Sequence, residues 1–218
     1  MIATGGEGGG HVGAVPTSLL VPQVAAAVDI PVIAAGGFFD GRGLVAALAW
    51  GAAGVAMGTR FLLTSDSPVA DEVKRLYLAA GLDGTVVTRR VDGVPHRALR
   101  TTMVDQLERG GRLGALVRSA RNAAAFRGVS GMGWREMLGQ GRVMRHESGL
   151  SWGQVLMAAN TPVLLRAAMV DGRTDLGLMS SGQVAGLIDD LPPCAELIEA
   201  IMAEAGATLD RLRLARRS

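Results

Sequence analysis

Cysteine, histidine and lysine are rare in the sequence. The scarcity of cysteine argues against disulfides, and that of histidine argues against a metal site. Its single cysteine, Cys194, excludes an internal disulfide and favours a reducing, cytoplasmic location. The three histidines, His11, His96 and His146, are far apart, and no Cys-x-x-Cys or His-x-x-x-His spacing occurs. We therefore predict no metal site. His96 and His146 are expected to be surface residues.

Long apolar runs and a strong charge of either sign are also missing. The run closest to a membrane segment, Leu44–Gly58, is shorter than the roughly 18–20 residues that cross a bilayer, and glycines interrupt it. The formal net charge is only +2. The arginine-rich tail has no aromatic residues that could stack on bases, so we interpret it as a solvated helix end. We therefore expect neither a nucleic acid nor a membrane as a partner.

Glycine, by contrast, is abundant, with 31 residues, and it follows three predicted strands. The strands lack polar alternation and are separated by predicted helices, which is typical of parallel strands buried on both faces. In the first glycine run the imidazole of His11 lies among glycines. The strands and their glycines are Met1–Thr4 before Gly5–Gly13, Ile30–Ala35 before Gly36-Gly37, and Gly54–Met57 before Gly58-Thr59; the helices between them are Val21–Val28 and Leu44–Trp50.

The rest of the sequence predicts one hairpin and several helices. Ser67 and Pro68 are typical of a helix start, with Ser67 as the N-cap and acidic Asp71 and Glu72 near the positive end of the helix dipole. The other predicted elements are hairpin strands Thr85–Val91 and Val94–Leu99 around Asp92-Gly93, a helical pattern over Thr101–Phe126, apolar helices within Leu150–Val170, a short element opening at Ser181, and an amphipathic helix from Pro193 to about Leu214, apolar at Leu197, Ile198, Ile201, Met202, Ala205 and Leu209.

The glycine-marked strand ends predict a phosphate site. The carboxyl ends of parallel strands form the ligand-binding face of an α/β fold. Glycines at Gly36, Gly37 and Gly58 let backbone N–H groups approach an anion, and Thr59 adds a hydroxyl donor. This is the arrangement of a phosphate site after the last two strands of a (β/α)8 barrel.

Four ordered segments resemble the nitronate monooxygenase family, also called 2-nitropropane dioxygenase-like. They are Glu7–Gly13, Pro31–Phe38, Gly54–Phe61 and Ser181–Asp190. The family consists of FMN-dependent (β/α)8 barrels and includes relatives that reduce enoyl thioesters with NAD(P)H. The resemblance implies an α/β fold: the C-terminal part of a TIM barrel, with three parallel strands, followed by a hairpin and a mainly helical extension. It divides the chain into an FMN-binding barrel segment, residues 1–80, and the extension, residues 81–218.

The resemblance also implies roles for individual residues. His11 falls on the active-site histidine of the family, beside the reactive edge of the flavin. Gly36, Gly37, Gly58 and Thr59 would hold the FMN phosphate. The other expected cofactor contacts are Gly9 and Gly10 along the flavin, Ala56 and Met57 along the ribityl chain, Gln183 close to the cofactor, and Thr4 as a small polar contact where relatives commonly have glutamine.

Three functional interpretations remain open. The first is an FMN-dependent monooxygenase in which His11 takes the α-proton of a nitroalkane and the nitronate is oxidised with O2. The second is a reductase of an enoyl- or steroid-ring-derived CoA thioester, with NAD(P)H reducing the flavin; the segment Gly149–Val155 resembles an actinobacterial subgroup of this kind. The third is a truncated, non-catalytic fragment, because the five preceding barrel strands have no counterpart. Its open strand edge would favour a homo-oligomer.

Overall fold

The computed structural model describes residues 1–109, 160–175 and 177–215. The chain forms two compact units, residues 1–85 with 181–218, and residues 86–180, and each is described by itself. His146, the segment 149–155 and residues 110–126 of the predicted helix over 101–126 lie outside the described residues. The predicted division of the chain at residue 80 stays a prediction.

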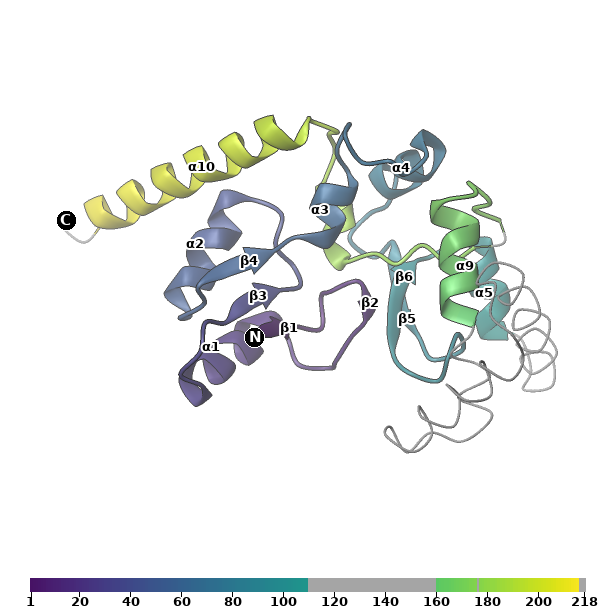
Figure 1. The fold of residues 1–218 in the computed structure, drawn as a ribbon, viewed down its shortest axis with the longest axis horizontal. Helices are drawn as coiled ribbons and strands as arrows, with labels where there is room; N and C mark the ends of the chain where they lie inside the picture. Colours follow the sequence, from purple (N-terminus) through teal and green to yellow (C-terminus); the bar gives the residue numbers. More distant parts are fainter. Residues whose placement is uncertain (110–159, 176, 216–218) are drawn as a thin grey trace. The chain divides into compact units, whose positions relative to one another are not determined.

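The first unit is built on a parallel three-stranded sheet, as the sequence predicts (Figure 1). The strands are β1 (Ile2–Thr4), β3 (Ile33–Ala35) and β4 (Gly54–Ala56), in the order β1-β3-β4. Ile33 pairs with Ile2 on one side and with Gly54 on the other. Helices connect consecutive strands, so the three carboxyl ends lie at one edge of the sheet.

Both connecting helices begin earlier in the chain than predicted. Helix α1 spans Thr17–Ala27 and α2 spans Gly41–Ala49. Asp40 starts α2, because its carboxylate accepts a hydrogen bond from the backbone N–H of Gly43 at 2.8 Å. The start of α1 has no side-chain cap from Pro16, the residue at its N-cap position. The backbone N–H of Thr17, the first residue of α1, donates instead to the carboxylate of Glu7 at 2.9 Å.

The helix predicted from Ser67 starts later, at Asp71, so the prediction of Ser67 as an N-cap is wrong. Helix α4 spans Asp71–Leu78 and has no side-chain cap. The carbonyl oxygen of Ser67 instead accepts from Nζ of the buried Lys74 at 2.8 Å, which holds the preceding segment against the helix. Asp71 and Glu72 do lie in the first turn, where the helix dipole favours acidic residues.

The last helix, α10 (Cys194–Ala215), packs on α2. A Cβ at Gly41 would lie 2.4 Å from the carbonyl oxygen of Ile201, so only glycine permits this approach. Leu197, Ile201 and Ala205 are buried as predicted. The rest of the predicted apolar stripe is exposed, because α2 covers only one face of the much longer α10: Ile198, Met202 and Leu209.

The core of the first unit lies between the sheet and these helices. Ala34 in the central strand β3 and Val21 in α1 are fully buried. Helix α3 (Gly58–Leu62) follows β4 directly, and the 3-10 helix η1 (Gln183–Leu187) packs against α3 and α4. Val32, Phe38, Ala47, Ala52, Leu197 and Ile201 complete much of this core.

The second unit contains the predicted hairpin, with shorter strands. Strand β5 (Thr85–Thr88), whose first residue belongs to the first unit, lies beside β6 (His96–Leu99), and Gly93 in the connection has φ +89°. Helices α5 (Thr102–Arg109) and α9 (Asn160–Met169) supply much of the rest of its described part. The core of this unit consists of Val91, Ala98, Val104, Leu107 and Leu178.

His96 is buried, so the prediction of a surface histidine is wrong. Its side chain is 1% exposed, and its Nε2 lies 2.7 Å from Oγ of Ser180. The segment around Ser180 runs beside β6, since Leu99 N–H donates to the carbonyl of Met179 at 2.9 Å. This neighbour is 84 residues away in sequence, which no local pattern shows.

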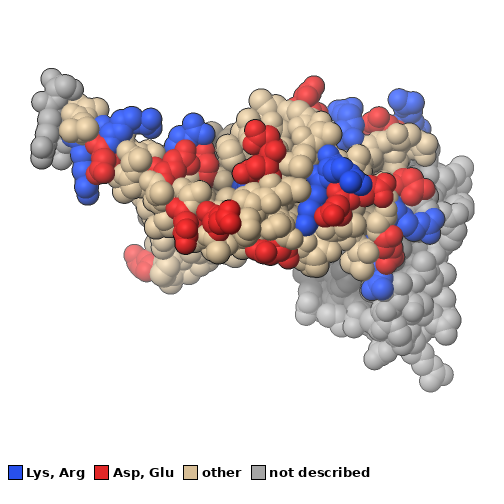
Figure 2. Space-filling model, turned by 90° about the horizontal axis from the view of Figure 1, so that it is seen from above, with Lys and Arg blue, Asp and Glu red and all other residues tan. Residues whose placement is uncertain are grey.

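Two observations concern the surface of the described residues. On the face drawn in Figure 2, acidic and basic side chains are interspersed, with no continuous patch of one sign among the described residues. In the described part of the chain, every helix is too short or too polar to span a bilayer.

Candidate functional site

Four loops of the first unit meet at the carboxyl edge of the parallel sheet. The loop after β1 joins the end of β3, because Gly5 N–H donates to the carbonyl of Ala35 at 3.0 Å. Gly182 N–H donates to Oγ1 of Thr59 at 2.9 Å, and Gln183 N–H donates to the carbonyl of Glu7 at 2.9 Å. The predicted cofactor residues from these four segments therefore lie in one region.

Gly36 and Gly37 adopt consecutive left-handed backbone conformations, with φ +93° and +83°. L-residues rarely adopt these angles. A Cβ at Gly36 would also lie 3.0 Å from the carbonyl oxygen of Gly5 and 3.1 Å from the hydroxyl of Thr17. The pair thus forms a turn without side chains, in a conformation that residues other than glycine rarely adopt.

Gly58 and Thr59 begin α3, at the end of the neighbouring strand β4. A Cβ at Gly58 would meet nothing within 4 Å, so its backbone is open to an approaching group. Thr59 accepts a hydrogen bond from Gly182 through Oγ1, which leaves the hydroxyl proton able to donate. The same side chain can therefore fix the Gly182 loop and contact an anion.

His11 lies in the two-residue strand β2 (Gly10–His11), and its side chain is exposed. The glycines before it are needed for packing: a Cβ at Gly9 would lie 2.6 Å from the backbone nitrogen of Gly182. Gly10 has φ +76°. The glycine run therefore brings the backbone before His11 into contact with the Gly182 loop.

The predicted cofactor contacts Thr4, Ala56 and Met57 differ from one another in solvent exposure. Thr4 ends β1 and is exposed, and Ala56 ends β4 and is half-buried. Met57 is 8% exposed and belongs to the hydrophobic core, so its side chain stabilises the fold.

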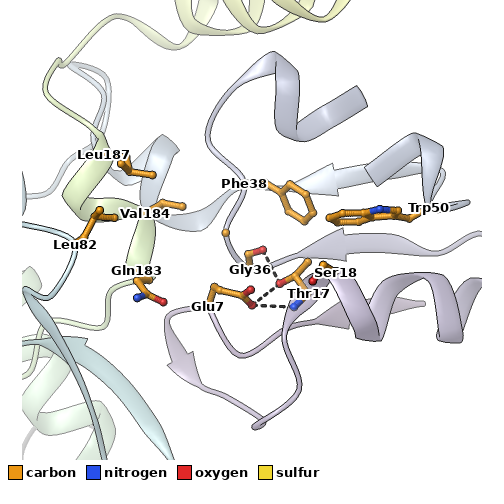
Figure 3. A pocket seen from close by; sticks show the side chains of 11 residues that line it. Glu7, Thr17, Ser18, Gly36, Phe38, Trp50, Leu82, Gln183, Val184 and Leu187 are labelled. Carbon is orange, nitrogen blue, oxygen red and sulfur yellow. Dashed lines mark hydrogen bonds between the residues drawn. The ribbon is translucent and has the colours of Figure 1, made fainter. Parts of the chain in front are cut away.

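A cavity of about 270 Å³ lies beside the Gly36-Gly37 turn (Figure 3). Three predicted residues line it: Gly36, Gly37 and Gln183. The rings of Phe38 and Trp50 lie 6.3 Å apart at one side of it. The remaining wall consists of Glu7, Thr17, Ser18, Leu82, Val184 and Leu187. The cavity is mainly apolar, and among the described residues Glu7 is the one ionisable side chain that lines it.

Sequence reasoning gave no role to Glu7, whose carboxylate lines the cavity and accepts two hydrogen bonds from Thr17. Its Oε2 accepts from the backbone N–H of Thr17 at 2.9 Å and lies 2.7 Å from the Thr17 hydroxyl. Thr17 is the first residue of α1, so Glu7 satisfies a donor that the helix start leaves unpaired. A lone carboxylate inside a run of glycines was the available signal.

Arg60 and Tyr77 are buried close to the elements of the site. Arg60 is 4% exposed; it forms an ion pair with Asp190 at 2.6 Å and donates to the carbonyl of Leu63 at 3.3 Å. It thereby ties α3 to the segment after η1. Burial raises the pKa of Tyr77 well above its ordinary value, so this phenol stays neutral and supplies no base.

The residues present fit a ligand that combines a phosphate with a large apolar ring. The left-handed turn at Gly36-Gly37 and the open backbone at Gly58 suit the phosphate, and the aromatic and aliphatic wall suits an apolar group. Glu7 opposes an anion by its charge, but its carboxylate is engaged by Thr17. Residues at the carboxyl edge of this sheet could therefore hold a phosphate-bearing cofactor.

The sequence model of the family described as nitronate monooxygenase matches residues 1–204. The chain belongs to this family. The predicted family and the partial TIM-barrel fold are thereby confirmed, and the family is flavin-dependent.

Curated relatives include two with the same name, (3aS,4S,5R,7aS)-5-hydroxy-7a-methyl-1-oxo-octahydro-1H-indene-4-carboxyl-CoA dehydrogenase. The one from Mycobacterium tuberculosis is 64% identical over 208 residues, 94% of this chain and 59% of the relative. The one from Rhodococcus jostii is 57% identical over 212 residues, 97% of this chain and 60% of the relative. The chain thus spans about three fifths of the length of these two relatives.

Solved structures of two other proteins share the fold of this chain. FabK from Thermotoga maritima superimposes with a TM-score of 0.70 at 36% identity, covering 97% of this chain and 56% of that one. Nitroalkane oxidase from Streptomyces ansochromogenes gives 0.66 at 26% identity, covering 97% and 52%.

Proposed function

We propose that this chain carries the phosphate-binding and histidine-bearing part of an FMN-dependent oxidoreductase that acts on a carboxyl-CoA thioester. The observation that supports this most is the left-handed Gly36-Gly37 turn beside an apolar cavity at the carboxyl edge of the sheet. The CoA thioester follows from the names of the two relatives that match nearly the whole chain.

The backbone N–H groups of Gly36, Gly37 and Gly58 and the Thr59 hydroxyl would hold the FMN phosphate. Gly9 and Gly10 would lie along the flavin. Bound FMN would supply the acceptor for a hydride or an electron pair. The remaining proposed contacts are Thr4, Ala56, Met57 and Gln183.

His11 would manage the proton of the reaction. A ring nitrogen of its imidazole would accept a proton from the substrate as hydride or electrons leave it, and would return that proton when the reaction runs towards reduction. The exposed position of His11 at the end of a glycine run leaves it accessible to a substrate.

Nitronate oxidation is the second candidate. The family model bears that name, and a probable nitronate monooxygenase of Staphylococcus saprophyticus is 39% identical over 118 residues. That match covers 49% of this chain, whereas the carboxyl-CoA relatives match over 94% or more. In this candidate His11 would take the α-proton of the nitroalkane and so form the nitronate that is then oxidised.

Anaerobic reduction of the FMN-loaded protein separates the candidates. We expect the visible flavin absorbance to be lost on mixing with NAD(P)H or with a bicyclic carboxyl-CoA thioester. An alkyl nitronate should produce little change. Loss of absorbance with the nitronate alone would contradict the CoA-thioester proposal and support the second candidate.

Location and assembly are also proposals. The single cysteine supports a location in the cytoplasm. In the described sheet, β1 has a neighbour on one side only and Ile2 is exposed, which supports association with another chain.

A further inference from the structure

Glu7 connects the start of α1 to the glycine-rich loop after β1. The backbone N–H of Thr17 has no partner within the helix, and Pro16 offers no side-chain cap. The Glu7 carboxylate takes that role from ten residues earlier in the chain, with Oε2 at 2.9 Å from the Thr17 nitrogen. A carboxylate at this end also interacts favourably with the helix dipole.

Thr17 extends the connection to the Gly36-Gly37 turn. Its single hydroxyl proton is shared between two acceptors, Oε2 of Glu7 at 2.7 Å and the carbonyl oxygen of Gly36 at 2.9 Å, and the residue is 4% exposed (Figure 3). The tight space around Gly36 leaves little room for this turn to shift independently. The position of the turn is thus tied to the pair of side chains Glu7 and Thr17.

The backbone of Glu7 connects the same loop to a third segment. Its carbonyl accepts from Gln183 N–H at 2.9 Å, next to the bond from Gly182 N–H to Thr59. A Cβ at Gly182 would lie 3.3 Å from the Glu7 carbonyl oxygen and 3.2 Å from Oγ1 of Thr59. One residue therefore joins the loops that carry His11, Gly36-Gly37 and Gln183.

We propose that Glu7 is a positioning residue that holds these three loops in the geometry that binds the flavin phosphate. It acts through Thr17 and the backbone and does not touch the reacting atoms. The flavin measurements that test this inference rest on the proposed function. The effect of Glu7 on the three loops does not depend on any cofactor.

The test compares Glu7→Ala with Glu7→Gln in the full 218-residue chain. The amide oxygen of glutamine can accept both bonds from Thr17, whereas alanine accepts neither. We expect Glu7→Ala to weaken FMN binding about tenfold and to change the visible circular dichroism of bound flavin, with Glu7→Gln restoring both to within about threefold of the parent. Glu199→Ala, which removes an exposed carboxylate on α10, is the matched control and should change neither.

Hydrogen exchange separates this inference from the proposed function. Without any flavin, the Gln183 amide in Glu7→Ala should exchange about tenfold faster than in Glu7→Gln. Equal exchange in the two variants, or equal FMN affinity in Glu7→Ala and Glu199→Ala, would overturn the positioning role. If the parent binds no FMN, the proposed function fails while the exchange result still decides the role of Glu7.

Thr17→Val covers the case in which Glu7→Ala does not fold. Valine keeps the backbone N–H that donates to Glu7 but removes the hydroxyl that lies beside Gly36. We expect FMN binding to fall several-fold, to about the extent that one lost hydrogen bond predicts, and Thr17→Ser to restore it. Unchanged binding in Thr17→Val would contradict the proposal.

Discussion

The His11→Ala variant is expected to lose turnover by a factor of about 10²–10⁴ while binding FMN as tightly as the parent to within about threefold. The imidazole is the proposed proton acceptor, whereas the flavin phosphate would be held by backbone groups of other loops. The His11 side chain is exposed, so its removal leaves no cavity in the core. Steady-state kinetics and an FMN titration on the same preparation measure the two effects.

His11→Gln is the matched variant, because it keeps a hydrogen-bonding side chain that cannot act as a base. It should lose turnover as His11→Ala does. If either variant loses FMN affinity in proportion to its activity, His11 positions the cofactor and is not the proton acceptor. Full activity in His11→Gln would exclude the imidazole as a base.

The Gly36→Ala variant is expected to bind FMN at least tenfold more weakly. Alanine at φ +93° is strained by about 1–3 kcal/mol. Its Cβ would also crowd the Gly5 carbonyl oxygen at 3.0 Å. Relief of the strain moves the turn whose N–H groups would hold the phosphate. Isothermal titration with FMN, alongside thermal unfolding, measures both consequences.

Gly51→Ala is the control for strain alone. Gly51 has φ +91° and follows α2; unlike Trp50 before it, it does not line the cavity, and a Cβ there would lie 3.2 Å from Cβ of Ala25. Both variants should lose similar stability, but only Gly36→Ala should lose FMN affinity. Equal loss of affinity in the two would mean that general destabilisation, not the turn, explains the effect.

The strands could be predicted from the sequence because their signal is local. Uninterrupted apolar runs before glycine identified β1, β3 and β4. The helix starts were less predictable, since α1 begins at Thr17 with a partner from a distant loop. The exposed half of the α10 stripe also depends on tertiary contacts, namely on how much of the helix α2 covers.

The site was predictable only in part, for the same reason. The glycine pair Gly36-Gly37 is visible in the sequence because no other residue adopts its backbone angles easily. The roles of Glu7 and Gly182 depend on contacts between segments far apart in the chain, as does the burial of His96 against Ser180. Single-sequence patterns carry no information about such pairs.

Comparing FMN with riboflavin tests the central claim most directly. The two ligands differ only by the phosphate that the glycine-marked strand ends are proposed to hold. We predict saturable FMN binding to the purified chain, riboflavin binding at least about tenfold weaker, and loss of this difference in Gly36→Ala. Equal affinity for the two ligands, or no FMN binding by the folded chain, would contradict the account.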